Sequence, residues 1–162
     1  MQSLLPHAEK VAALLKRRGE SVAVAESSTG GLIAAALLAM PGASAYFLGG
    51  AVVYTKAARA ALLDIGDAEM VGMRPSTEPY ALMIAKYVRD KHGAVWGLGE
   101  SGATGPTGNR YGDAAGHSCI AVAGKIEKAI TLETGQTDRE GNMRAFAARA
   151  LVLFAETLEG AR

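Results

Sequence analysis

Residues 21–40 read S-V-A-V-A-E-S-S-T-G-G-L-I-A-A-A-L-L-A-M, and this stretch decides the fold class. Residues 21–25 form a short apolar run, which is typical of a buried strand. Polar residues and glycines follow at positions 26–31, and residues 32–40 are rich in helix-forming alanine and leucine. A buried strand that turns directly into a helix is a building unit of layered α/β domains.

The same alternation of strand and helix patterns continues along the chain. The last two expected strands are close enough in sequence to form a hairpin, and no linker or repeat divides the chain. This order predicts one α/β domain, residues 1–162, with a mixed sheet. We expect further helices over residues 3–18, 56–63, 78–92 and 139–158, and strands over residues 46–54, 94–98, 118–123 and 129–133.

The overall composition argues against several classes of function. Hydrophobic residues make up 49% of the chain and charged residues 20%, with a formal net charge of +1. That balance offers no basic surface for nucleic acid or an acidic membrane. No stretch reaches the roughly 18 apolar residues of a membrane span, so we expect a cytoplasmic protein. Cys119 is the only cysteine, there are three histidines, and we expect no metal site.

The polar turn at residues 26–31 is the first candidate site. Ligands of α/β sheets bind beyond the carboxyl ends of the strands, where this turn is expected. Backbone N–H groups at a helix start favour negative charge, so Ser27 is a candidate nucleophile whose oxyanion they would hold. The alternative is that Ser27, Ser28 and Thr29 only cap the helix.

A second glycine-rich segment, residues 99–108, reads G-E-S-G-A-T-G-P-T-G and is expected to be a loop. It would either wrap around an anionic or amide group or build plain turns. Ser27, Asp113 and His117 have the residue types of a catalytic triad, and sequence order does not exclude one. The simpler interpretation of His117 is a surface histidine.

Four motifs follow one another along the chain: residues 25–31 read A-E-S-S-T-G-G, residues 41–47 P-G-A-S-A-Y-F, residues 52–55 V-V-Y-T and residues 101–106 S-G-A-T-G-P. They resemble the motifs A-E-S-C-T-G-G, P-G-S-S-A-x-F, V-x-Y-S and S-G-I-A-G-P of the CinA C-terminal domain family, whose active members are nicotinamide-nucleotide amidases. The resemblance covers nearly the whole chain and implies a three-layer α/β/α domain with a mixed, largely parallel sheet. It also implies the stand-alone form, without a separate amino-terminal domain.

The resemblance implies hydrolysis of the carboxamide of nicotinamide mononucleotide to nicotinic acid mononucleotide and ammonia. It implies a homodimer without a metal or organic cofactor, which binds a pyridine nucleotide or a related amide. Ser27 matches the nucleophile and Tyr54 the tyrosine at the site. The substrate-binding positions that it suggests are Thr29, Gly30, Gly31, Ser44, Ser101, Gly102, Thr104, Gly105 and Arg139.

The catalytic base is the first departure from the family pattern. The family has Y-S-N-x-x-K, whereas residues 54–59 read Y-T-K-A-A-R, so Arg59 stands at the lysine position. Arginine stays protonated and cannot accept a proton. It would instead hold a phosphate or carboxylate, or point to solvent. Lys56, one helical turn earlier on the same side, is the candidate for a displaced base.

The second departure is the segment 108–116, G-N-R-Y-G-D-A-A-G, where the family has a lysine-proline-valine-glycine stretch. It adds Arg110 and Asp113, so we expect an altered substrate pocket. Arg139 is either an anion-binding residue or an exposed residue of the last helix. Three functions remain open: the family amidase, an amidase with another substrate and a rearranged base, and a catalytically silent binding or regulatory homologue.

Overall fold

The computed structural model describes residues 1–161 and arranges them around a five-stranded sheet with the order β2-β1-β3-β4-β5. β1 pairs in parallel with β2 and β3, whereas β4 is antiparallel to both β3 and β5. Four strands therefore run in one direction, which confirms the mixed, largely parallel sheet. The strands are β1 (Val22–Glu26), β2 (Phe47–Val52), β3 (Trp96–Ala103), β4 (His117–Ala123) and β5 (Lys128–Glu133).

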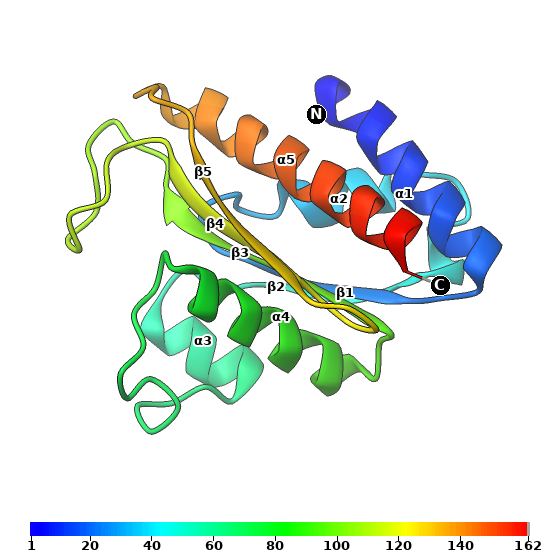
Figure 1. Ribbon diagram of the computed structural model, residues 1–162, viewed down its shortest axis with the longest axis horizontal. Helices are drawn as coiled ribbons and strands as arrows, with labels where there is room; N and C mark the ends of the chain where they lie inside the picture. The colour runs from blue at the N-terminus through cyan, green and yellow to red at the C-terminus, as the bar shows by residue number, and fades with distance from the viewer. Residues whose placement is uncertain (162) are drawn as a thin grey trace.

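Helices cover both faces of this sheet (Figure 1). One face carries α1 (Leu5–Arg18), α2 (Leu32–Leu38) and α5 (Arg139–Gly160), and the other carries α3 (Lys56–Leu63) and α4 (Glu78–His92). The short 3-10 helices η1 (Gln2–Leu4) and η2 (Ala43–Ala45) precede α1 and β2. The architecture is thus the three-layer α/β/α arrangement. None of the helices within residues 1–161 is long and apolar enough to cross a membrane.

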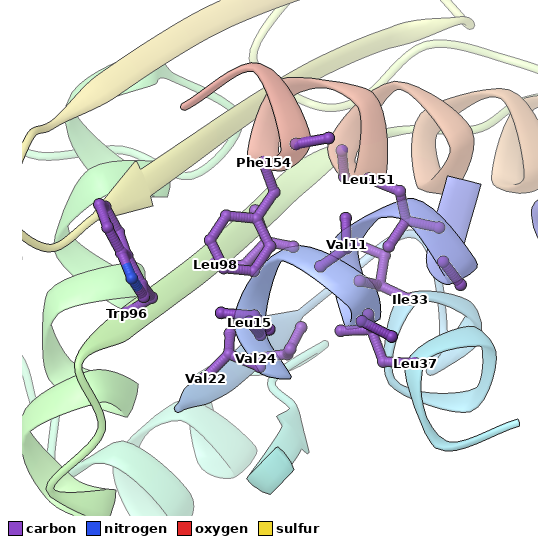
Figure 2. Packing of buried hydrophobic residues seen from close by; sticks show 14 of the residues in the cluster. Val11, Leu15, Val22, Val24, Ile33, Leu37, Trp96, Leu98, Leu151 and Phe154 are labelled. Atoms are coloured by element: carbon purple, nitrogen blue, oxygen red, sulfur yellow. The ribbon is translucent and has the colours of Figure 1, made fainter. Parts of the chain in front are cut away.

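The sheet has a hydrophobic core on each face because neighbouring side chains of a strand point in opposite directions. Val22 and Val24 of β1 belong to the core under α1, α2 and α5, and Ala23 and Ala25 to the core under α4. This explains why residues 21–25 read as a continuous apolar run. Figure 2 shows the larger core, in which Trp96 is fully buried beside residues of α1 and α5.

The prediction of a loop over residues 99–108 is wrong for its first half, because β3 continues to Ala103. The glycines there permit close packing and do not end the strand. A Cβ atom on Gly99 would lie 2.2 Å from the carbonyl oxygen of Ala81 in α4. One on Gly102 would lie 2.3 Å from the carbonyl oxygen of His117 in β4. Glycine in a strand is typical of such close backbone approach.

Candidate functional site

Glu26, the last residue of β1, binds the start of α2 from inside the protein. Its buried carboxylate accepts hydrogen bonds from the N–H groups of Ile33 (2.8 Å) and Ala34 (2.9 Å). These are N–H groups that a helix start leaves unpaired. The expectation that they would be free to hold an oxyanion is therefore wrong. The start of α2 is therefore bound by the side chain of Glu26, and not capped by the hydroxyl groups of Ser27, Ser28 and Thr29.

Glu100 of β3 binds the other side of the same turn. Its fully buried carboxylate accepts hydrogen bonds from the backbone N–H groups of Ser27 (3.1 Å) and Thr29 (2.9 Å). The hydroxyl groups of Ser28, Thr29 and Ser118 also donate to it. Sequence analysis missed Glu100 because residues 99–108 were interpreted as a loop. The sequence did contain a signal for a buried functional carboxylate, because Glu100 directly follows the apolar residues of a strand.

The hydroxyl of Thr29 lies between the two buried carboxyl groups, 2.8 Å from an oxygen of Glu26 and 2.8 Å from one of Glu100. A hydroxyl carries one proton and can donate to only one of them. The second contact therefore needs a proton on one of the carboxyl groups. Burial raises the pKa of Glu26, and the nearby charge of Glu100 adds to that rise. A proton on Glu26 would let this carboxyl group donate to the Thr29 oxygen while the Thr29 hydroxyl donates to Glu100.

Ser27, the candidate nucleophile, is half-buried. Its backbone N–H is bound to Glu100, and its hydroxyl donates to no other side chain within residues 1–161. The glycines that follow it have φ angles of 64° (Gly30) and 99° (Gly31), which favour glycine and form the turn into α2. Thr29 is fully buried. Thr29 therefore holds the turn from inside, whereas Gly30 is exposed and Gly31 half-buried, and their backbone shapes the turn.

Lys56, the candidate displaced base, and Arg59, at the lysine position, both contact residues other than Ser27. Lys56 Nζ lies 2.7 Å from Asp67 Oδ1, and the two side chains are 70% and 80% exposed. The hydrogen bond from Lys56 lowers the pKa of Asp67. Arg59 is only 7% exposed, which corrects the interpretation that it points to solvent. Its guanidinium carbon lies 5.8 Å from the centre of the Tyr80 ring.

A cavity of about 200 Å³ opens where β2 and β3 end, and we call it the edge pocket. Arg139 crosses it, with Nη1 donating to the carbonyl oxygen of Gly105 (2.6 Å) and Nη2 to the Tyr54 hydroxyl (3.3 Å). The edge pocket is lined by several of the site residues expected from the sequence, namely Tyr54, Gly102, Thr104, Gly105 and Arg139. Ser28 lines it as well.

Asn142 of α5 supports the edge pocket and was missed by sequence analysis. It is buried, and its amide donates to the carbonyl oxygens of Thr104 (2.8 Å) and Gln136 (2.9 Å). It also accepts a hydrogen bond from the Thr134 hydroxyl (2.6 Å). The sequence gives no signal for this supporting role, since most asparagine residues lie on the protein surface.

Of the suggested substrate-binding residues, Thr29, Gly30 and Gly31 do not line the edge pocket, and neither do Ser44 and Ser101. Ser44 lies in η2, before β2 begins, whereas the edge pocket lies beyond the end of β2. At roughly 3.3 Å per residue along a strand, the two positions are about 20 Å apart. Ser101 is buried, and its hydroxyl accepts a hydrogen bond from the N–H of Ser76 (3.1 Å).

His117 does not form a triad with Ser27, and it is also not the surface histidine that was expected. It is only 8% exposed, with Nε2 2.8 Å from the carbonyl oxygen of Ser76 and Nδ1 in contact with the Glu133 carboxylate. Burial alone would lower the pKa of His117, but these contacts and Asp113 raise it. Cys119, two residues on, is also buried.

Comparison with known proteins agrees with this architecture. Residues 5–158 match the model of the CinA C-terminal domain. A CinA-like protein from Gloeobacter violaceus is 39% identical over 144 residues, which cover 88% of this chain and 34% of that protein. One from Anaeromyxobacter sp. (strain K) is 37% identical over 145 residues, 90% of this chain and 36% of that protein. The chain thus spans about a third of the length of the curated relatives it matches.

Solved structures show the same fold. The competence damage-inducible protein A from Klebsiella pneumoniae is 24% identical with a TM-score of 0.91, covering 98% of this chain and 99% of that chain. The competence/damage inducible protein from Agrobacterium tumefaciens is 25% identical with a TM-score of 0.87, covering 96% and 95%. The match over residues 5–158 shows that the chain belongs to the CinA C-terminal domain family.

Proposed function

We propose that this chain is a ligand-binding member of the family that does not carry out serine-based amide hydrolysis. Its ligand would be nicotinamide mononucleotide or a related amide, held in the edge pocket. The observation that carries the proposal is Glu100, whose carboxylate already binds the N–H groups of Ser27 and Thr29.

Amide hydrolysis by a serine generates an oxyanion, and enzymes stabilise it with N–H donors that are free and aimed at it. Loss of a single such donor lowers the rate by roughly 10²- to 10³-fold. Here, the donors on either side of Ser28 point to a carboxylate. An oxyanion next to that carboxylate would be repelled, because like charges in a buried site destabilise one another.

Proton transfer from Ser27 would also lack a base. Arg59 cannot accept a proton at neutral pH. Lys56 is exposed and bound to Asp67 at the surface, so its amine is engaged away from Ser27. The lack of a proton acceptor at Arg59 and Lys56 supports the proposal that the chain binds its ligand without hydrolysing it.

The edge pocket supplies groups that suit an amide with a ribose or a phosphate. Arg139 and the Tyr54 hydroxyl provide donors, and Thr104, Thr107 and Asn109 add polar side chains to the lining. Polar groups that converge in a concave site are typical of ligand-binding pockets.

A second candidate function is amide hydrolysis through Ser27 with a base other than a lysine of this chain. The observation that favours it is the half-buried Ser27 hydroxyl, which no other side chain within residues 1–161 binds. This candidate predicts ammonia release that depends on Ser27, and the first candidate predicts none.

The test combines calorimetric binding of nicotinamide mononucleotide with an ammonia-release assay. We expect binding without ammonia release for the wild type, and binding at least tenfold weaker for Arg139→Ala. Arg144→Ala is the matched control, because Arg144 lies on the same helix and pairs only with Glu140 at the surface. Ammonia release by the wild type that is lost in Ser27→Ala would contradict the proposal.

A further inference from the structure

The two departures from the family pattern, Arg59 and the segment 108–116, meet in one cavity. Its volume is about 520 Å³, within the roughly 300–1,000 Å³ of typical ligand sites. We call it the arginine pocket. It lies between the start of α3, the segment before α4 and the segment after β3, and its lining includes Tyr54, Lys56, Arg59, Arg74, Arg110 and Tyr111.

The lining of the arginine pocket has an excess of positive charge. Four of its residues are basic and one, Asp67, is acidic. Asp67 pairs with Lys56, and Arg74 forms two hydrogen bonds to Asp113, at 2.8 and 3.2 Å.

Arg59 and Arg110 remain without a carboxylate within 4 Å among residues 1–161. Arg110 is exposed and stacks near the Tyr111 ring, 5.9 Å from its centre.

Arg59 is the unusual member of this set. It is 7% exposed, and its Nε atom is buried with no hydrogen-bond partner among residues 1–161. Its neighbour Tyr80 offers a ring face, and burial raises the pKa of the Tyr80 hydroxyl, so it stays neutral near pH 7. A buried guanidinium is costly unless an anion pairs with it. Its surroundings therefore suit an anion that comes from outside the chain.

We propose that the arginine pocket binds the phosphate group of a small phosphomonoester. Arg59 is the buried anchor, and Arg110 contacts the same phosphate from the open side. Guanidinium groups bind phosphate through paired N–H···O bonds, which fits a dianion with several acceptor oxygens. The cavity is much larger than a phosphate ion, so an organic group attached to the phosphate has room. This inference does not depend on what the edge pocket binds.

The first test is calorimetric titration with inorganic phosphate at low ionic strength. We expect saturable binding at one site in the wild type, and at least tenfold weaker binding in Arg59→Met and Arg110→Ala. Arg17→Ala is the control, because Arg17 is an exposed arginine of α1 on the opposite side of the sheet. It should bind phosphate as the wild type does.

A second arm identifies the source of the phosphate. Ribose 5-phosphate should bind at least as tightly as inorganic phosphate, and ribose alone should not bind. No saturable binding of either phosphate compound by the wild type would overturn the proposal. So would wild-type affinity in both Arg59→Met and Arg110→Ala.

The unliganded variants provide an independent check on folding. Arg59→Met removes a buried charge that pairs with no carboxylate among residues 1–161, so its thermal midpoint should equal or exceed that of the wild type. Arg110→Ala changes only an exposed side chain. If Arg59→Met does not fold, the affinity of Arg110→Ala for phosphate decides the matter, and an unchanged affinity overturns the proposal.

Discussion

Replacing Glu100 tests the central feature of the turn. Its carboxylate accepts five hydrogen bonds, two from backbone N–H groups and three from hydroxyl groups. In Glu100→Ala, the hydroxyl groups can rotate toward other acceptors. The N–H groups of Ser27 and Thr29 are fixed by the backbone and would lose their only acceptor in a buried site.

The magnitude follows from those two groups. A buried donor without a partner costs about 1 to 3 kcal/mol, so two of them predict a loss of about 2 to 6 kcal/mol. For a domain of this size, about 4 kcal/mol corresponds to a fall in the melting temperature of roughly 8 to 16 °C. Glu100→Gln keeps one oxygen for the N–H groups and turns its amide toward the hydroxyl groups. We expect it to lose less than about 2 kcal/mol.

Urea denaturation at pH 7, followed by circular dichroism, measures both variants against the wild type. The interpretation requires Glu100→Ala to be clearly less stable than Glu100→Gln. A loss below about 1 kcal/mol in Glu100→Ala would mean that the N–H groups find another acceptor. The role of Glu100 in holding the turn would then be refuted.

Three further predictions concern stability. Thr29→Val keeps the side-chain shape but removes the hydroxyl between the two carboxyl groups, and should cost about 1 to 3 kcal/mol in urea denaturation. Asn142→Ala should cost a similar amount, about 1 to 3 kcal/mol, because the buried carbonyl oxygen of Thr104 loses its donor; an unchanged midpoint would contradict this. Burial would raise the pKa of Glu20, but hydrogen bonds led by that from Arg18 lower it from 4.5 to about 2. Since the folded pKa is the lower one, this stabilisation is complete above about pH 4.5 and is lost as the pH falls toward 2; Glu20→Gln should flatten the stability curve in that range.

Most helices and strands could be predicted from the sequence, because their signals are local. The polar turn after residues 21–25 and the helix-forming block after it correspond to the end of β1 and to α2. Thr77 caps α4, accepting a hydrogen bond from the N–H of Tyr80, and this cap also depends only on neighbouring residues. The end of β3 was misjudged because a glycine that allows close packing looks the same in sequence as one that forms a turn. Only the neighbouring backbone of α4 and β4 distinguishes the two.

The site was predictable in part. Tyr54 and Arg139 do meet, 85 residues apart, but the motifs alone carried no information about their hydrogen bond. Ser44 illustrates the opposite case, because an ordered motif does not reveal at which end of a strand its residues lie. Glu100 could not be identified, since its role depends on the pairing of β3 with β1, a contact between segments more than 70 residues apart.

Glu100 and Arg59 are both buried charges, and the difference between them argues for their different roles. Glu100 has five donors around it, so its burial is compensated entirely by the chain and it serves to hold the turn. Arg59 has a buried Nε atom without a partner within residues 1–161, beside a cavity with further arginines. A charge that the fold compensates fully needs no ligand, whereas one that it leaves uncompensated at a cavity wall is stabilised by binding one. The same substitution that removes the family's base thus supplies a group suited to hold an anion.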